Sequence, residues 1–256
     1  MAVTLPPGYE ERSAGDVIAF AWRPAAPWLE SVIAGGGRLH EWAAARKEAK
    51  PLVGRGTVHA VDSPAEGPDG RERWAVRRYK RGGLIAPLLR DRYLRSGPTR
   101  PIRELWATVE ARARGVPAPA VVAGAVSGAG SFYRADLATE LIPDARTLEA
   151  LIFGSGGTPD ASPLLHRAGH LVRTMEDALV LHVDLNAANV LLVRGEEGAH
   201  VVDLDRCIVF PLGYRAFGNA MRRRLERSLR KLARKYGRGI EVDEWEALRA
   251  GYEEGA

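Results

Sequence analysis

Hydrophobic and polar residues alternate along the first half of the chain in a way that predicts β-strands. Two β-like runs, at residues 53–61 and 73–79, flank a polar connection at residues 64–71 that contains Gly and Pro. Strand-like runs joined by such a connection are typical of a β-hairpin. Two further strand-like runs follow at residues 120–126 and 132–142.

An amphipathic helix is predicted between these two groups of strands, over residues 101–114. Its apolar stripe keeps the spacing of one helix face and consists of Ile102, Leu105, Trp106 and Val109. Gly115 ends the helix, and the VPAP segment that follows breaks the pattern.

Helical spacing dominates from Pro143 onward, as in the apolar stripe of residues 164–179. The order of elements therefore predicts an α+β fold with two parts. Residues 1–142 would form an N-terminal extension and a β-rich part, and residues 143–256 a mainly helical part with a basic C-terminal helix. The pattern leaves the role of residues 1–50 undefined.

The composition is that of a globular protein with a sizeable core, because 46% of the 256 residues are hydrophobic and 27% are charged. The single cysteine, Cys207, excludes a disulfide framework and a cysteine-rich zinc site. The start of the chain lacks the features of a secretory signal, and no apolar run approaches the roughly 20 residues that span a bilayer. We therefore expect a cytoplasmic protein, either free or peripheral on the inner side of a membrane.

Most of the positive charge lies in one segment. Residues 215–238 contain ten Arg or Lys and one acid, Glu226, whereas the whole chain carries a net charge of +5. Because the remainder is net acidic, we expect no binding to nucleic acid. The segment predicts a helix with an apolar stripe formed by Phe217, Met221, Leu225, Leu229, Leu232 and Tyr236. Its basic face can be a solvated surface or can bind anionic lipid. Both interpretations can be true at once, because the apolar face can pack inward while the cations face lipid.

The strongest chemical signal is the segment HVDLNAANVLL at residues 182–192. It matches the kinase catalytic-loop pattern H-x-D-L-x-x-x-N, with His182, Asp184, Leu185 and Asn189 at the fixed positions. Phosphoryl transfer needs an acceptor for the substrate hydroxyl proton, which Asp184 can supply, and an oxygen ligand for the metal at the phosphates, which Asn189 can supply.

A second metal ligand is predicted at Asp203, which follows the strand-like segment AHVV. Its carboxylate and the amide oxygen of Asn189 are ligands that Mg²⁺ prefers. The alternative is that Asp184, Asn186 and Asn189 only shape a loop between two strands, because Asn and Asp favour turns. The complete pattern, followed by a hydrophobic strand and Asp-Leu-Asp, favours catalysis.

Residues 1–142 contain the candidate nucleotide-binding groups, which are Gly54, Gly56, Thr57, Glu104, Glu140 and Ile142. The two glycines and the threonine could bring backbone N–H groups close to phosphates, although short glycine pairs are usually turns. The glutamate on the predicted helix could pair with a phosphate-binding cation on a strand, or it could be a solvated helix residue. Glu140 and Ile142, in the segment ATELIP, could meet adenine through backbone atoms.

These features together resemble the 3-deoxy-D-manno-octulosonic acid (Kdo) kinases and the related lipopolysaccharide core heptose kinases. The segments that carry the resemblance are GRGTVH (54–59), AVRRYKRGGL (75–84), DRYL (91–94), RGVPAP (114–119), TELIPDARTL (139–148), HVDLNAANVLL (182–192), VDLDRC (202–207) and RLERSLRKL (224–232). The resemblance implies a bilobal protein-kinase-like fold and the use of ATP and Mg²⁺. It also implies a Kdo hydroxyl of lipid A-linked lipopolysaccharide as the acceptor, reached at the cytoplasmic face of a bacterial inner membrane.

Two positions depart from the protein-kinase pattern. The strand lysine that binds the phosphates is replaced by Arg77, which stays charged and can bind phosphate bidentately. Lys80 is the other candidate, but three residues along a strand it points to the opposite face, so we expect Arg77 to act. The sequence at 203–205 is Asp-Leu-Asp instead of D-F-G, and without that glycine a flipping activation switch is not expected.

Two alternatives remain at this point. The acceptor could be a heptose, an aminoglycoside-like molecule or a protein Ser or Thr. The chain could also be an ATP-binding pseudokinase, an alternative that Arg77 keeps open and that the catalytic-loop pattern argues against.

Overall fold

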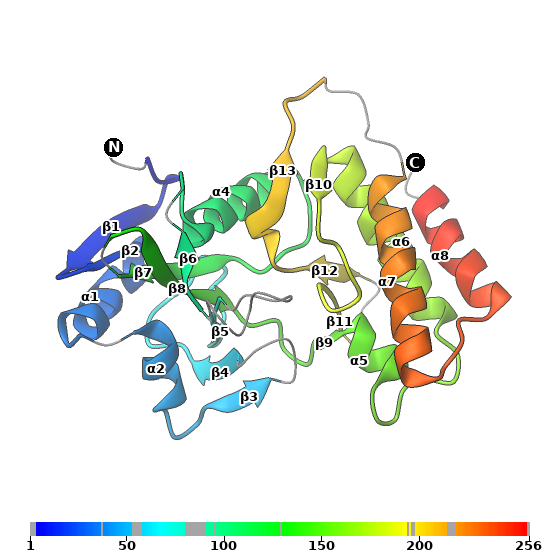
Figure 1. Ribbon diagram of the computed structural model, residues 1–256, viewed down its shortest axis with the longest axis horizontal. Helices are drawn as coiled ribbons and strands as arrows, with labels where there is room; N and C mark the ends of the chain where they lie inside the picture. Colours follow the sequence, from blue (N-terminus) through cyan, green and yellow to red (C-terminus); the bar gives the residue numbers. More distant parts are fainter. Residues whose placement is uncertain are drawn as a thin grey trace. The chain divides into compact units, whose positions relative to one another are not determined.

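The computed structural model describes residues 4–36, 38–52, 58–79, 91–94, 96–128, 130–193, 195, 198–213 and 219–254 (Figure 1). The chain divides into two compact units, one comprising residues 1–109 and 120–141 and the other residues 110–119 and 142–256. The boundary after Leu141 lies one residue from the expected one, whereas residues 110–119 belong with the second unit. Within the described residues, no helix is both long and apolar enough to cross a membrane.

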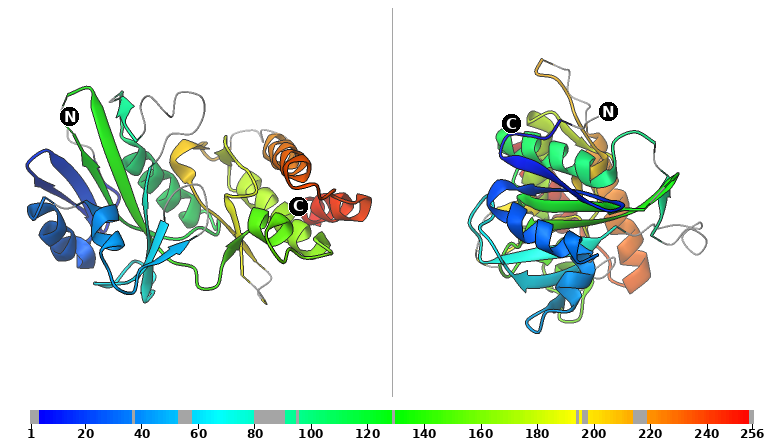
Figure 2. Two further views of the ribbon diagram at one scale, coloured as in Figure 1. Left: turned by 60° about the horizontal axis from the view of Figure 1, so that its bottom comes forward. Right: turned by 90° about the vertical axis from the view of Figure 1, so that its left-hand side faces the viewer.

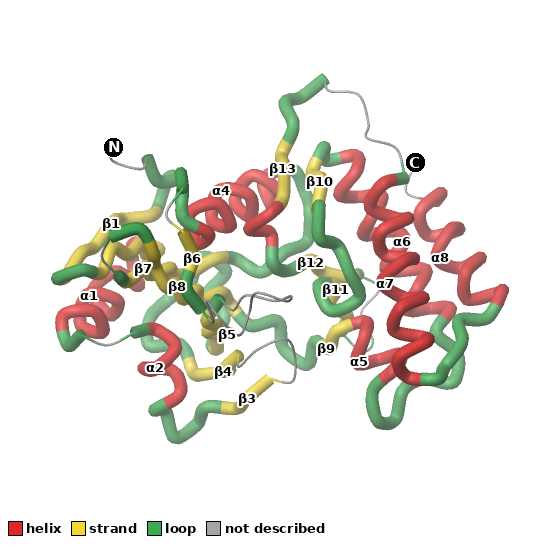
Figure 3. Tube along the Cα trace, viewed as in Figure 1, coloured by secondary structure: helices red, strands yellow, loops and turns green. Residues whose placement is uncertain are grey.

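The first unit is built on an antiparallel sheet with eight strands among the described residues (Figure 3). The strands are β1 (Tyr9–Ala14), β2 (Val17–Trp22), β3 (Lys50–Leu52), β4 (Val58–Asp62), β5 (Arg73–Arg78), β6 (Tyr93–Leu94), β7 (Val121–Ser127) and β8 (Phe132–Glu140). Their order is β1-β2-β7-β8-β5-β4-β3, and β6 pairs with β8. The predicted β4–β5 hairpin is confirmed, with Val58 opposite Arg77 and Asp62 opposite Arg73.

The first 50 residues, whose role the sequence left undefined, extend this sheet and cover one of its faces. β1 and β2 add two strands next to β7. The short helix η1 (Arg23–Ala25) leads into α1 (Ala26–Ala34), which α2 (Leu39–Ala44) follows. These helices pack on the sheet through three tryptophans, since the ring of Trp28 lies 4.9 Å from those of Trp42 and Trp74.

The predicted helix is α4 (Arg100–Ala113), which covers the opposite face of the sheet (Figure 2). Leu105 is fully buried there, with Phe20 and Leu137 of the sheet. The predicted apolar stripe is wrong in one respect, because the Trp106 side chain is 39% exposed while Glu104 is buried. The helix is rotated so that Glu104 faces inward, where side chains of the first unit bind its carboxylate.

The second unit contains four α-helices and several short strands among its described residues. The helices are α5 (Leu148–Phe153), α6 (Ser162–Asp177), α7 (Ala220–Tyr236) and α8 (Val242–Glu254). The strands are β9 (Arg146–Thr147), β10 (Val180–His182), β11 (Val190–Leu192), β12 (Ala199–Val201) and β13 (Cys207–Val209), and the 3-10 helix η2 spans Leu204–Arg206. The predicted pairing of 190–192 with the segment that begins at Ala199 is confirmed by β11 and β12.

Helices α6 and α8 approach each other closely enough to require glycine at the crossing. A Cβ atom on Gly251 would lie 2.0 Å from the carbonyl oxygen of His166, and one on Gly169 would lie 2.2 Å from that of Leu248. Such distances are far below van der Waals contact, so any larger residue would push the two helices apart.

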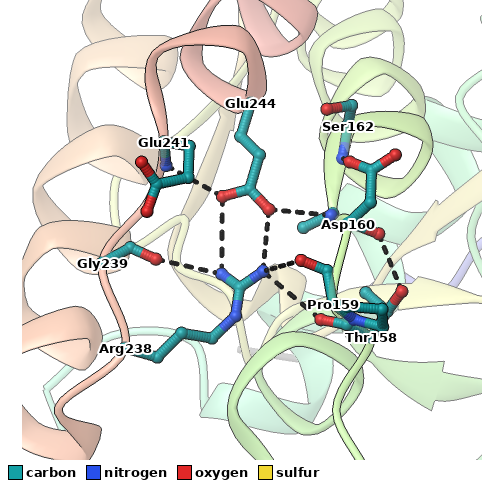
Figure 4. A network of polar contacts seen from close by, with 9 residues as sticks. Thr158, Pro159, Asp160, Ser162, Arg238, Gly239, Glu241 and Glu244 are labelled. Carbon is teal, nitrogen blue, oxygen red and sulfur yellow. Dashed lines mark hydrogen bonds and ion pairs between the residues drawn. The ribbon is translucent and has the colours of Figure 1, made fainter.

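A polar network fixes the connection between α7 and α8 to the start of α6 (Figure 4). Glu244 accepts hydrogen bonds from the Arg238 guanidinium at 2.7 Å and from the Ala161 N–H at 2.8 Å. The same guanidinium donates to the carbonyl oxygens of Thr158 and Pro159. Burial opposes ionisation of Glu244, but these bonds hold its pKa below the usual value, so the carboxylate stays charged at neutral pH.

The C-terminal basic segment forms α7 as predicted. Met221, Leu225, Leu229 and Leu232 are buried on one side of this helix. Tyr236 departs from the predicted stripe, because it is exposed and stacks on Phe153 with 5.7 Å between ring centroids. Phe217 lies outside the described residues.

Candidate active site

The loop with the kinase-like pattern lies in the second unit, between β10 and β11. His182 of β10 pairs with Cys207 of β13, and Val190 of β11 pairs with Val201 of β12. The loop 183–189 and the loop 202–206 therefore connect the same two pairs of strands. A hydrogen bond from Val202 N–H to the carbonyl oxygen of Asn189, at 3.0 Å, joins the two loops directly.

His182 holds this loop in place. Its ring is buried, Nδ1 accepts from the Asp184 N–H at 3.3 Å, and Nε2 lies 3.3 Å from the carbonyl oxygen of Val202. Burial lowers the pKa of His182, so the ring is neutral, with Nδ1 as acceptor and Nε2–H as donor. His182 thus links the position of Asp184 to the loop that carries Asp203.

Two asparagines complete the loop through their side-chain amides. The Asp184 carbonyl oxygen accepts from Asn186 Nδ2 at 2.8 Å and from Asn189 Nδ2 at 3.4 Å. Asn186 Oδ1 also accepts from the Ala188 N–H at 3.0 Å, so the loop-shaping alternative holds for Asn186. Within the described residues, Asn189 Oδ1 accepts no hydrogen bond, and this oxygen is available as a ligand.

The Asp184 carboxylate takes no part in shaping the loop. Its Oδ1 atom accepts a hydrogen bond from Arg224 of α7, and its Oδ2 atom accepts one from Arg206 of η2. Helix α7 also supports the loop through Ser228, whose Oγ accepts from the Ala187 N–H at 3.2 Å. Neither arginine was predicted as a site residue, because Arg224 is one of many cations on a basic helix and Arg206 is only part of a family motif.

Asp203 directly precedes η2 and has a left-handed backbone conformation, with φ of 69° and ψ of 50°. This conformation costs a non-glycine residue roughly 1 to 2 kcal/mol, although Asp and Asn tolerate it better than most. Strained residues of this kind cluster at functional sites.

The oxygen groups of these two loops fit Mg²⁺. The Asp203 carboxylate and Asn189 Oδ1 are hard ligands, and the bond between residues 189 and 202 links the segments that carry them. The described residues include no cluster of three His, Cys, Asp or Glu side chains that could hold a metal. That is compatible with Mg²⁺, which is commonly bound by one or two carboxylates together with substrate phosphates.

The first unit contains the predicted ion pair between Arg77 and Glu104. Arg77 Nη2 lies 2.7 Å from Glu104 Oε1 and 2.6 Å from Oε2, and the Tyr79 hydroxyl donates to the same carboxylate. Glu104 is therefore not the solvated helix residue that the alternative supposed. The guanidinium of Arg77 also lies over the Tyr79 ring, 4.5 Å from its centroid, so the position of this cation is well defined.

All of the predicted nucleotide-binding roles stay predictions, including those of Arg77 and Glu104. Gly54, Gly56, Thr57 and Lys80 lie outside the described residues, although β3 and β4, which residues 53–57 join, pair as antiparallel neighbours. The Glu140 N–H donates to the Ala120 carbonyl oxygen, and its buried carboxylate accepts from the N–H groups of Asp69 and Arg71. Burial raises the pKa of Glu140. Ile142 is buried at the start of the second unit.

A strand cation paired with a helix glutamate, together with an H-x-D-L-x-x-x-N loop and a following aspartate, defines a protein-kinase-like phosphotransferase. Residues 42–252 match the family described as "Lipopolysaccharide kinase (Kdo/WaaP) family", and the chain belongs to this family. The α+β fold is therefore protein-kinase-like, as the sequence predicted.

Several relatives carry the name 3-deoxy-D-manno-octulosonic acid kinase. The protein from Vibrio cholerae serotype O1 is 34% identical over 170 residues, which cover 66% of this chain and 68% of the relative. The protein from Photobacterium profundum is 35% identical, with 70% of this chain and 74% of the relative covered. The protein from Vibrio vulnificus strain YJ016 is 30% identical, with 83% and 86% covered.

We expect Arg77→Ala to raise the KM for ATP more than Lys80→Ala does. Arg77 is held on β5 by Glu104 and Tyr79, where a strand cation can bind phosphate. Loss of one charged hydrogen bond costs about 1.5 to 3 kcal/mol, or about 10- to 100-fold in KM. Arg77→Lys should retain part of the affinity, because it keeps the charge. Steady-state kinetics with varied ATP would measure this, and a larger effect of Lys80→Ala would contradict it.

Proposed function

We propose that the protein is an ATP-dependent kinase that phosphorylates a hydroxyl group of Kdo in the inner core of lipopolysaccharide. The observation that carries the proposal is the Asp184 carboxylate. The histidine and asparagine side chains around it shape the catalytic loop, whereas the carboxylate accepts no hydrogen bond from the loop itself. Membership of the lipopolysaccharide kinase family and the name of the relatives, 3-deoxy-D-manno-octulosonic acid kinase, support this acceptor.

In this mechanism, Asp184 accepts the proton of the Kdo hydroxyl as the hydroxyl oxygen attacks the γ-phosphorus of ATP. The bond from the γ-phosphorus to the bridging oxygen breaks, ADP leaves, and the proton remains on Asp184 until it passes to solvent. Arg77 binds phosphate oxygens, with its guanidinium oriented by Glu104. Asn189 and Asp203 would hold Mg²⁺, which neutralises charge on the phosphates when bound.

The experiment that tests this function is mass spectrometry of Kdo-bearing lipid A after incubation with the protein, ATP and Mg²⁺. A product heavier by one phosphate, formed only when ATP is present, would support the proposal. Parallel reactions should contain lipid A without Kdo and a heptose-bearing core. Transfer to the heptose alone would identify the heptose kinase alternative, and transfer to no acceptor would favour the pseudokinase alternative.

We also propose that the protein contacts an anionic membrane surface through a basic stripe on α7, formed by Arg223, Arg227, Lys231 and Arg234. Their spacing places them within one face of the helix, opposite its buried side. Within the described part of the chain, none of the four has an ion-pair partner. By contrast, Arg222 pairs with Glu226 at 2.5 Å, and Arg230 pairs with the same residue and lies over Trp245. The Lys80-Arg81 pair, also expected to contribute, lies outside the described residues.

We expect the triple variant Arg227→Gln, Lys231→Gln and Arg234→Gln to bind anionic vesicles about 100-fold more weakly, because each cation near such a surface contributes about 1 kcal/mol. Vesicle sedimentation at two salt concentrations would measure this. Phosphorylation of membrane-embedded acceptor should slow more than that of a delipidated one. The matched control is Lys47→Gln, Arg103→Gln and Arg249→Gln, which removes the same charge from other exposed positions. Equal binding by the two triple variants would contradict the proposal.

A further inference from the structure

We propose that Arg206 and Arg224 bind an anionic group of the acceptor, namely a carboxylate close to the hydroxyl that receives the phosphate. The inference rests on the proposed kinase function and adds the residues by which the site would recognise its acceptor. Arg206 comes from η2 and Arg224 from α7, so two elements of the second unit converge on Asp184.

The ion pairs at Asp184 join one carboxylate to two guanidinium groups, so the cations outnumber the single carboxylate that both contact. Within the described residues, neither arginine has a second ion-pair partner. An excess cation beside the catalytic carboxylate favours an acceptor that brings its own negative charge.

Stability of the fold does not account for this arrangement. The side chains of Arg206 and Arg224 are 53% and 42% exposed, and that of Asp184 is 35% exposed. Ion pairs with this exposure contribute little to stability, because water screens them and two long side chains must be ordered. The same exposure leaves both guanidinium groups accessible to a ligand.

The position of the acceptor follows from the role of Asp184. A hydroxyl that gives its proton to this carboxylate must lie about 2.6 to 3.2 Å from one of its oxygens. Each of these oxygens already accepts from one arginine, so the acceptor enters a space next to both guanidinium groups. A substituent on the same sugar ring is then within reach of Arg206 or Arg224.

The donor groups of the arginines suit a carboxylate. Each guanidinium has five N–H donors in a planar fork, and one nitrogen of each is bonded to Asp184. The remaining donors can form the paired hydrogen bonds that arginine makes with carboxylates. An acceptor carboxylate would also draw one guanidinium partly away from Asp184 and leave that oxygen to receive the hydroxyl proton. A sugar acid such as Kdo has such a group, whereas a neutral heptose does not.

The test compares two soluble acceptors, a Kdo methyl glycoside with its free carboxylate and the same compound as the carboxamide. Neither contains the phosphates of lipid A, so any effect of charge belongs to the sugar carboxylate. Loss of a charged hydrogen bond lowers kcat/KM by about 10- to 100-fold. The wild type should therefore prefer the free carboxylate to the carboxamide by that factor. In Arg206→Ala and Arg224→Ala, this preference should shrink to less than about threefold, while the KM for ATP stays nearly constant.

Arg224→Lys should restore part of the preference, because the positive charge returns without the fork. Arg249→Ala is the matched control, since Arg249 is an exposed arginine of α8 in the same unit. Calorimetric titration with free Kdo gives a readout apart from turnover, and binding should weaken in both alanine variants and not in the control. Equal losses on the two acceptors, or unchanged binding of Kdo, would overturn the inference alone. Absence of transfer by the wild type to any Kdo acceptor would overturn the proposed function and the inference with it.

Discussion

Replacing Asp184 with alanine is expected to reduce phosphoryl transfer by about 10² to 10⁴-fold, which is the usual contribution of a positioned general base. In the proposed mechanism the carboxylate orients the hydroxyl and accepts its proton, and no other group of the loop can take over, since His182 is buried and both of its nitrogens are engaged. Single-turnover rates with saturating ATP and acceptor would measure the loss at the chemical step.

The same variant should remain folded. Asp184 shapes the loop through its backbone, whose N–H and carbonyl oxygen are retained in alanine. The two arginines that lose their partner are exposed enough to be solvated. Asp184→Asn is the matched variant, because it keeps the shape of the side chain and removes its ability to accept the proton. Turnover of either variant within about tenfold of the wild type, with unchanged thermal unfolding, would remove Asp184 from the proposed mechanism.

Asp203→Asn is expected to lower kcat/KM for Mg·ATP by about 100-fold or more, because the proposed metal site would lose its anionic ligand. A metal ion at the phosphates contributes several kcal/mol of charge stabilisation. Asparagine is the appropriate replacement, since it tolerates the left-handed conformation at φ of 69°, in which alanine would be strained. The midpoint of a magnesium titration should shift to higher concentration.

A readout independent of turnover is the rise in unfolding temperature that ADP causes in the presence and absence of Mg²⁺. The wild type should be stabilised further by the metal, because a ligand that binds only the folded state raises its stability. The variant should lose most of this additional shift. Unchanged magnesium dependence in both measurements would show that Asp203 is not a metal ligand.

The polar side chains of the site could be predicted from the sequence to different extents. The catalytic loop was recognisable because its residues are close together along the chain, and the spacing H-x-D-L-x-x-x-N is typical of kinases. The pairing of Arg77 with Glu104 was also predicted, since a strand and the helix that follows it must pack together. The burial of Glu104 was not predicted, because it depends on rotation of α4 and on the Tyr79 hydroxyl, which has no signal in the helical pattern.

The sequence by itself determined the elements whose pattern is local. The β4–β5 hairpin, α4, α6 and the β11–β12 hairpin follow from alternation, helical spacing and turn residues, each of which needs only a few neighbouring positions. The sequence also determined the family, because the matching segments are spread along most of the chain.

Only the tertiary structure decided which distant side chains share an environment. Arg224 lies 40 positions after Asp184, in a helix whose many cations look alike in the sequence, and the packing of α7 against the catalytic loop selects this one. The first 50 residues likewise gained a role only in the fold, where β1 and β2 join later strands in one sheet and Trp28 and Trp42 pack with Trp74 of β5. Contacts of this kind arise from burial and from side-chain direction in three dimensions, for which the local order of residues carries no periodic signal.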